Sequence, residues 1–179
     1  MPASSRDHSF EAVVLPHLDA AYNLARWLMR DGAAAEDVVQ EAMLRALSYF
    51  ASFRGFNPRG WLLQIVRNAA YDAMAPERER QFVPLPEAGA DEGGGLPDLV
   101  APEEDPEAAL IRARDHCRVH RLIAELPVEL REALVLRELE ELSYKEIAEI
   151  AGIPIGTVMS RLWRARRMLA DAAQREGAL

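Results

Sequence analysis

The segment LSYKEIAEIAGIPIGTVMSRLWRARRML, which begins at residue 142, leaves the chain few choices of local structure. Ser143 and Glu146 form a capping box, because each side chain can satisfy an exposed backbone N–H at a helix start. Gly152 predicts the end of that helix, since glycine adopts the left-handed conformation at little cost. Pro154 then favours the start of a second helix. Two helices joined by a short turn that contains glycine are typical of a helix-turn-helix unit.

The second helix of this segment has an apolar face and a polar, cationic face. At about 100° per residue, four side chains share the face that we expect to pack inward: Val158, Leu162, Ala165 and Leu169. The opposite face and its flanks carry the predicted DNA-contacting residues: Thr157, Met159, Ser160, Arg161, Trp163, Arg164 and Arg167. In a helix-turn-helix unit the second helix enters the major groove, where arginine offers a planar donor fork to guanine or phosphate. A solvated cationic helix end is the alternative. An outward Trp163 disfavours that alternative.

This cationic helix belongs to an acidic chain of 179 residues with a formal net charge of -8. Residues 76–110 contain ten acidic and two basic residues, so this segment accounts for the whole net charge. The net charge therefore does not exclude an anionic partner for the segments on either side. The segment is rich in Pro, Gly and acids and lacks a sustained period, which is typical of a linker, or of an unstructured insertion. We therefore predict two domains, at residues 1–75 and 107–179, joined by an acidic linker at residues 76–106.

Both flanks carry apolar residues at helical spacing, and nothing alternates with period two, so we expect an all-α fold. The expected helices span residues 10–31, 34–50, 61–75, 106–125, 126–139 and 143–151, with a last helix from residue 154. Pro16 interrupts the first helix, and Asp31-Gly32 ends it. Pro76 ends the third, because the residue before a proline disfavours helix. Pro127 lies in the first turn of the fifth.

Composition and motifs exclude several classes of protein. The single cysteine, Cys117, permits no internal disulfide, which fits a reducing cytoplasm. No apolar run approaches the ~18 residues of a membrane span, and the N-terminus lacks a signal-peptide pattern. His116 and His120 beside Cys117 suggest a zinc site, but a structural site needs four ligands and no further ligand lies nearby, so we predict no metal and no cofactor. No phosphate-binding loop, nucleophile elbow or HExxH motif occurs, which predicts that the chain is not an enzyme.

The segment LPVELREALVLRELEELSYKEIAEIAGIPIGTVMSRLWRARRML resembles region 4 of sigma-70-family transcription initiation factors. AEDVVQEAMLRAL resembles their region 2.2, and FRGFNPRGWLLQIVRNAAYDAM resembles their regions 2.3 and 2.4. The resemblance covers about residues 10–75 and 107–172 and is greatest to the small two-domain extracytoplasmic-function (ECF) class. It implies a cytoplasmic protein without membrane insertion that binds core RNA polymerase, directs it to promoter DNA and is regulated by an anti-sigma factor.

The resemblance also implies roles for residues at matching positions. The acidic surface of region 2.2, which in the family binds the clamp helices of the polymerase largest subunit, corresponds here to Asp37, Gln40 and Glu41. Asp37 also suits a dipole-stabilised helix start. Regions 2.3 and 2.4 capture a flipped-out base of the melted -10 strand, and region 4 holds the -35 duplex. The -10 residues here are Phe53, Arg54, Asn57, Arg59 and Asn68. An aromatic surface and amides suit an unstacked base. We expect Trp61 to be a core anchor, and Asn68 equally suits a capping or buried hydrogen-bonding role.

Two positions depart from the family pattern. MAPERER stands where members often carry a basic cluster, which weakens the expected phosphate contact there. Met159 stands where many members have arginine, and it cannot donate to a base edge. The resemblance therefore does not define which -35 sequence this chain prefers. The main alternative is a stand-alone helix-turn-helix regulator, which the region 2.2-like surface disfavours. A sensing or enzymatic N-terminal unit is another, and no pocket motif supports it.

Overall fold

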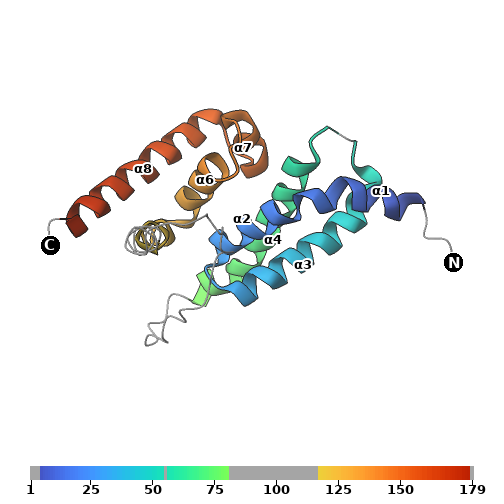
Figure 1. The fold of residues 1–179 in the computed structure, drawn as a ribbon, viewed down its shortest axis with the longest axis horizontal. Coiled ribbons are helices and arrows are strands. Elements are labelled where there is room, and N and C mark those ends of the chain that lie inside the picture. The colour runs from blue at the N-terminus through green and yellow to red at the C-terminus, as the bar shows by residue number, and fades with distance from the viewer. Residues whose placement is uncertain (1–4, 55, 81–116, 178–179) are drawn as a thin grey trace, which may run out of the picture.

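The computed structural model describes residues 5–54, 56–80 and 117–177, and these ranges are helical with no strand. The N-terminal unit consists of α1 (Ser5–Val14), α2 (Leu18–Met29), α3 (Gly32–Tyr49) and α4 (Pro58–Arg80). The C-terminal unit consists of a helical segment at residues 117–124, followed by α6 (Val128–Glu138), α7 (Tyr144–Ala151) and α8 (Ile155–Gly177). Figure 1 shows the two units side by side, with α8 extending away from the N-terminal unit. None of the described helices is both long and apolar enough to cross a bilayer.

Local breaks in the N-terminal unit lie close to the predicted ones. A 3-10 turn, Leu15–His17, separates α1 from α2, and Pro16 lies inside it as expected of a residue without a backbone N–H. Helix α2 ends at Met29, just before the predicted stop at Asp31-Gly32, because Arg30 already takes the left-handed conformation with φ of 63°. Asp31 instead caps α3, where its carboxylate accepts hydrogen bonds from two backbone N–H groups of the first turn.

Helix α4 is longer at both ends than the sequence predicts. Asn57 caps it: its Oδ1 accepts the Gly60 N–H at 2.9 Å, and Pro58 occupies the first helical position. The predicted end before Pro76 was wrong. A proline removes a single N–H···O bond, to the carbonyl four residues earlier, and this 23-residue helix accommodates that loss close to its end. The rest of the predicted linker, and residues 106–116 of the next predicted helix, lie outside the described residues.

Helices α7 and α8 form the predicted helix-turn-helix unit. The Ser143 N–H donates to Oε2 of Glu146 at 2.9 Å, and the Glu146 N–H donates to Oγ of Ser143 at 3.3 Å, which confirms the capping box. Gly152 ends α7 in the left-handed conformation, with φ of 65°. The predicted inward face of α8 is confirmed, since three of its apolar residues are buried and Leu169 is half-buried. Pro127 caps α6, one residue before its first turn.

The two units pack directly on each other, with α6 against α2 and α7 against α4. Their buried apolar residues form one cluster that runs from Phe10 in α1 to Leu162 in α8. Burial of each large aliphatic side chain contributes about 1.5–3 kcal/mol. Two of the predicted site residues, Arg59 and Arg161, lie at this interface.

Candidate nucleic-acid and polymerase interface

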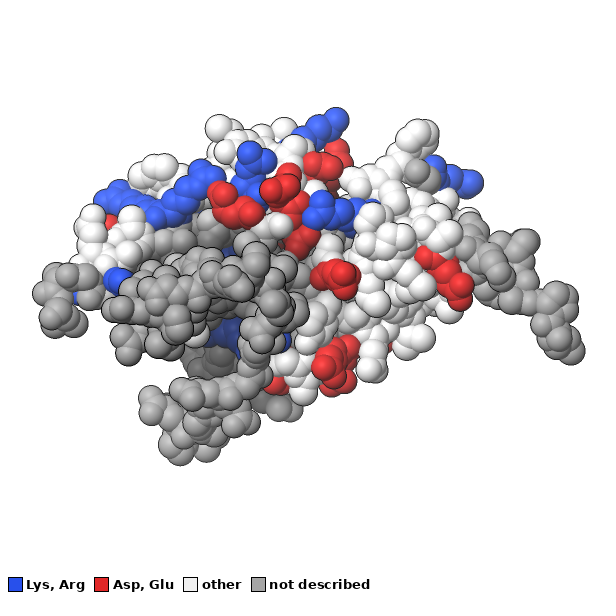
Figure 2. Space-filling model, viewed as in Figure 1, with Lys and Arg blue, Asp and Glu red and all other residues white. Residues whose placement is uncertain are grey.

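The polar face of α8 is exposed over the first turns of the helix. Its exposed side chains are Met159, Ser160, Trp163, Arg164 and Arg167, which confirms their predicted orientation. The guanidinium of Arg167 lies 5.2 Å from the ring centroid of Trp163, within reach of a cation–π interaction. Figure 2 shows basic side chains gathered along α8. This face therefore offers an aromatic surface and unburied arginines to bases or phosphates.

Arg161 and Thr157 are less accessible than the other residues predicted on α8. The Arg161 side chain is 16 % exposed, and its Nη1 lies 3.6 Å from Oε2 of Glu132 in α6. Thr157 is half-buried, and its carbonyl oxygen accepts the Ser160 hydroxyl at 3.0 Å. In this conformation Arg161 therefore faces a carboxylate of its own chain.

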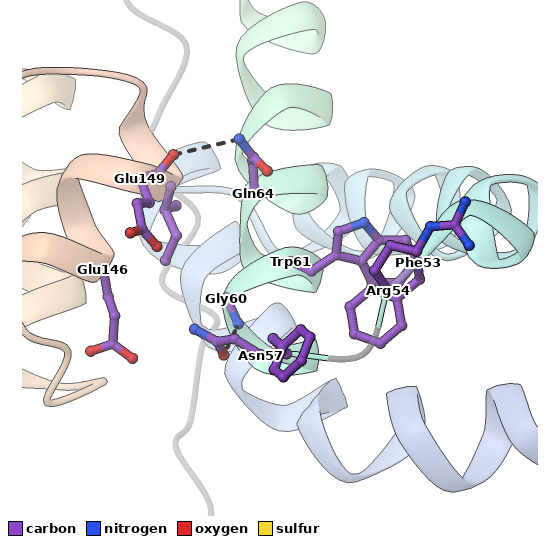
Figure 3. A pocket seen from close by; sticks show the side chains of 10 residues that line it. Phe53, Arg54, Asn57, Gly60, Trp61, Gln64, Glu146 and Glu149 are labelled. Atoms are coloured by element: carbon purple, nitrogen blue, oxygen red, sulfur yellow. Dashed lines mark hydrogen bonds between the residues drawn. The ribbon is translucent and has the colours of Figure 1, made fainter.

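Part of the predicted -10 site lines one cavity of about 270 Å³ before and at the start of α4. Phe53, Arg54 and Asn57 contribute to its wall together with Trp61 (Figure 3). The ring centroids of Phe53 and Trp61 lie 4.7 Å apart at an interplanar angle of 35°. Trp61 is half-buried and packs on the core, as predicted, and it also forms a wall of this cavity. Aromatic rings beside amide groups can accept an unstacked base.

The other -10 candidates have distinct environments. Asn57 uses its Oδ1 to cap α4, so only its Nδ2 can donate to a ligand. A Cβ at position 60 would lie 2.6 Å from that Nδ2, so the close approach of Gly60 depends on the missing side chain. Arg59 points across the interface and forms an ion pair with Glu140. Asn68 is exposed in the middle of α4 and lies outside the cavity wall, so it is neither a helix cap nor buried.

Gln64 belongs to the cavity wall, although we did not predict it. Its Nε2 lies 3.5 Å from the carbonyl oxygen of Glu149 in α7. Trp61, Gln64 and Asn68 recur at positions i, i+3 and i+7, so they share one face of α4. The same helical spacing that identifies a core face also identifies this polar face. It was the pattern in the sequence from which Gln64 could have been predicted.

The predicted polymerase-binding residues lie together on α3. Asp37, Gln40 and Glu41 are all exposed. Arg45, one turn further on, donates from Nε to Glu41 at 2.7 Å and from Nη1 to Asp72 of α4 at 2.7 Å. These bonds, first that to Asp72 and then that to Glu41, raise the pKa of Arg45. Arg45 therefore balances part of the negative charge of this surface.

An apolar strip continues the acidic surface of α3. Leu44 is 63 % exposed and Leu47 is 52 % exposed, and Leu44 follows Asp37 at the i+7 position. Neighbouring exposed leucines are typical of a protein-binding surface more than of a solvated one. The sequence reasoning missed these residues because apolar residues on a helix are first assigned to the core.

Glu132 of α6 is buried at the interface between the two units. Its side chain is 1 % exposed; Oε1 accepts a hydrogen bond from Arg67 of α4, and Oε2 accepts one from the Tyr71 hydroxyl at 3.2 Å. Burial raises the pKa of Glu132, and the charge of Arg67 opposes that effect. Burial, followed by the charge of Glu132, raises the pKa of Tyr71 well above its ordinary range. Arg67, which precedes Asn68 in α4, is a further residue of this interface, and the sequence did not predict its role.

Glu140 is the second buried carboxylate at this interface, between α6 and α7. Its side chain is 6 % exposed. One oxygen pairs with Arg59, and the other accepts the Asn23 amide of α2 at 2.7 Å. Both buried acids of the C-terminal unit thus accept hydrogen bonds from side chains of the N-terminal unit.

Arg131 of α6 is a buried cation at the same interface. Its guanidinium donates to the carbonyl oxygens of Ala124, Leu126 and Leu28, and the last of these bonds crosses to α2 at 3.2 Å. Burial, followed by the charge of Arg30, lowers the pKa of Arg131 to about 10. Arg131 therefore remains protonated near neutral pH and ties the carboxyl end of α2 to the C-terminal unit.

The residues weighed as zinc ligands are only partly described. His120 stacks on Trp27 of α2 with ring centroids 4.4 Å apart, Cys117 is exposed, and His116 lies outside the described residues. Within the described ranges, no three His, Cys, Asp or Glu side chains are grouped to hold a metal ion.

Comparison with known proteins assigns both units to one family. The profile of sigma-70 region 2 matches residues 13–80, and that of sigma-70 region 4 matches residues 118–169. The chain is 36% identical over 171 residues to the RNA polymerase sigma-H factor of Pseudomonas aeruginosa, which covers 93% of this chain and 86% of that protein. It is 38% identical over 142 residues to the ECF RNA polymerase sigma-E factor of Escherichia coli K12, which covers 77% and 73%.

Solved structures show the same fold. The sigma factor RpoE from Bartonella quintana, in complex with the anti-sigma factor NepR, superposes with a TM-score of 0.70 at 26% identity, over 93% of this chain and 97% of that chain. CnrH, in complex with the cytosolic domain of CnrY, has a TM-score of 0.63 at 23% identity, over 94% and 90%, which supports the fold alone. The region 2 match precedes the region 4 match along the chain, and the chain belongs to the sigma-70 family of RNA polymerase sigma factors, in its ECF class.

Proposed function

We propose that this chain binds core RNA polymerase and places it at promoters, with α8 on the -35 duplex and the start of α4 on the melted -10 strand. The observation that carries the proposal is that one chain has two surfaces, each suited to a different form of DNA. One is the exposed Trp163, Arg164 and Arg167 face of a helix-turn-helix unit. The other is the aromatic and amide-lined cavity around Phe53 and Trp61. A duplex needs the first surface, and an unstacked base needs the second.

The two units divide this work. Residues 1–75 contact polymerase through Asp37, Gln40 and Glu41, and the exposed Leu44 and Leu47 extend that contact. Acidic and apolar side chains in one row suit a helical partner with basic and apolar residues. Residues 107–179 hold the duplex. The chain performs no catalysis in this scheme, since the polymerase makes the RNA, and it works in the cytoplasm where polymerase and promoter meet.

An anti-sigma factor is a further proposed partner. The similar RpoE structure is that of a sigma factor with an anti-sigma factor bound. That chain and this one correspond over nearly their whole lengths, so both units of this chain have counterparts in a protein that an anti-sigma factor can bind. We therefore propose that this chain is regulated in the same way.

Transcription in vitro tests the main proposal. The purified chain is mixed with core polymerase and DNA from upstream of its own gene, and transcripts are mapped. We expect defined start sites that appear only when chain and polymerase are both present. Tight binding of the chain alone to duplex DNA, with no effect of polymerase, would instead support a stand-alone helix-turn-helix regulator, which needs only the α8 surface.

A further inference from the structure

Helix α8 carries a mainly apolar cavity within its cationic face. This α8 cavity has a volume of about 620 Å³ and is lined by Tyr144, Met159, Leu162, Trp163, Arg166 and Arg167. Tyr144 is the first residue of α7, and the other five belong to α8. The face that we propose to meet the -35 duplex therefore combines cations with an apolar hollow.

Helical spacing explains the shape of the α8 cavity. Met159 and Trp163 lie four residues apart, so their side chains are neighbours on one face of α8. Both are exposed, whereas Leu162 is buried and Tyr144 is half-buried against the core. The cavity thus has a floor that is fixed by core packing and two large apolar walls that are open to solvent.

The two arginines of the lining have partners beside the cavity. Nη2 of Arg166 donates to Oε1 of Glu138 at 2.6 Å, and the guanidinium of Arg167 lies 5.2 Å from the ring centroid of Trp163. A guanidinium has more N–H donors than these contacts use, so both exposed arginines can also bind phosphates. Charge complementarity therefore favours DNA as the occupant of the cavity over a neutral apolar molecule.

The chemistry of the cavity walls selects one group on a base-pair edge. In a helix-turn-helix unit, base edges are contacted by the N-terminal part of the second helix, and Met159 is the fifth residue of α8. Met159 has no hydrogen-bond donor to offer a base. The apolar substituent that the major groove presents is the C5-methyl group of thymine, whereas guanine presents the acceptors N7 and O6. A guanine edge at this place would lose water without gaining a donor from Met159.

We propose that the α8 cavity binds the C5-methyl group of a thymine in the -35 element, with Met159 and Trp163 as its walls. Met159 is then a residue that determines specificity, and it selects thymine at one position by apolar contact. This inference rests on the proposed function and deepens it, because it names the base group that α8 reads.

Deoxyuridine tests the proposal, because it lacks only the C5-methyl group of thymidine. The DNA is the promoter that the chain and core polymerase transcribe best in vitro, with each -35 thymine replaced in turn. Competition binding measures the affinity of the complex of chain and polymerase for each duplex. We expect one replacement to weaken binding about fourfold, which corresponds to about 0.8 kcal/mol for one methyl group removed from water.

Variants of α8 connect that thymine to the cavity. Met159→Ala should make binding insensitive to the replacement, and Met159→Leu should retain the sensitivity, since leucine keeps an apolar wall. Met168→Ala is the matched control, because Met168 is an exposed methionine of the same helix that lies outside the cavity lining. It should retain the fourfold effect. Equal sensitivity in M159A and M168A would overturn the inference.

A wild-type complex that binds the promoter but senses no -35 methyl group would also overturn the inference, and it would leave the proposed function intact. A second measurement does not depend on polymerase. The chain alone selects duplexes from one random library that is amplified with either thymine or uracil nucleotides. Preferential recovery of the thymine library, lost in M159A, would support the cavity even if the chain directs no transcription and the proposed function fails. Equal recovery of both libraries would contradict it.

Discussion

The guanidinium of Arg67 in α4 donates to Oε1 of Glu132 in α6, across 65 residues of sequence. Glu132 is almost fully buried, and Tyr71 and Arg161 complete its surroundings. Because water cannot solvate this carboxylate, its partners must be in place when the units meet. The contact therefore specifies how the two units fit together more than it adds net stability.

Arg67→Ala should lower the stability of the packed chain by about 3 kcal/mol, because Glu132 then keeps its burial and loses its main cation. Urea unfolding followed by circular dichroism measures this loss as a lower midpoint of the first transition. Arg166→Ala is the control, since its pair with Glu138 is half-exposed on both sides and should be worth less than about 1 kcal/mol. A similar loss in both variants would argue against a special role for the buried pair.

The capping box of α7 predicts a pH dependence. Hydrogen bonds from the backbone and then the side chain of Ser143 lower the pKa of Glu146 in the folded chain. The folded chain thus binds this proton less tightly than the unfolded chain. The contribution of Glu146 is present above its ordinary pKa of about 4.3 and is lost as pH falls through the lower folded value.

Glu146→Gln isolates that contribution, because glutamine keeps the box but carries no charge. We expect wild type to be more stable by about 0.5 kcal/mol at pH 7 and the difference to shrink as the pH falls below the ordinary pKa of about 4.3. Unfolding midpoints at several pH values measure it. Ser143→Ala serves as a comparison. It removes the side-chain cap itself and should destabilise α7 at both neutral and acidic pH. A constant difference between wild type and E146Q would contradict the assignment to Glu146.

Signals between near neighbours in the sequence predicted the structure well, whereas contacts across the units were not predicted. The capping box at Ser143 and the left-handed Gly152 depend on a few adjacent residues, so their outcome was readable in advance. The position of Arg161 on the flank of α8 was readable too. Its neighbour Glu132 was not, because helical spacing says where a side chain points and not which helix lies opposite. For the same reason, the sequence of α6, in which Glu132 is one of several charged residues, gave no hint that the partner of Glu132 lies in α4.

Substitutions at Asn57 can separate helix capping from base reading. Asn57→Asp retains the Oδ1 that accepts the Gly60 N–H but loses the Nδ2 donor, so stability should be preserved while binding of the melted -10 strand weakens severalfold. Asn57→Ala should lose both, with about 1 kcal/mol of stability. Urea unfolding and promoter opening with polymerase measure the two effects. Strand opening that survives in N57D would show that Asn57 is a cap only, and Asn68→Ala would then be the amide variant to examine.

Arg164→Ala should weaken initiation that depends on the -35 element by about tenfold, because one arginine contact to a base is worth about 1–3 kcal/mol. The side chain is exposed, and its Nε donates to the Ser160 carbonyl at 3.4 Å within the same helix, so the fold should be unaffected. Transcription from templates with and without the -35 element measures the loss, and co-purification with core polymerase should be unchanged. Loss of polymerase binding in this variant would contradict the division of roles between the units.

Met159→Arg should change which -35 sequence the chain prefers. Met159 is 54 % exposed on the face of α8 that carries Trp163, so an arginine there reaches the same groove without disturbing the core. Methionine offers an apolar surface that favours a thymine methyl, whereas arginine donates to O6 and N7 of guanine. Selection of active promoters from a library randomised at the -35 element, with wild type and M159R in parallel, should show guanine enriched at one position for the variant only. An unchanged preference would mean that Met159 does not face a base edge. Helix α8 would then present Ser160 and Arg164 to the bases instead.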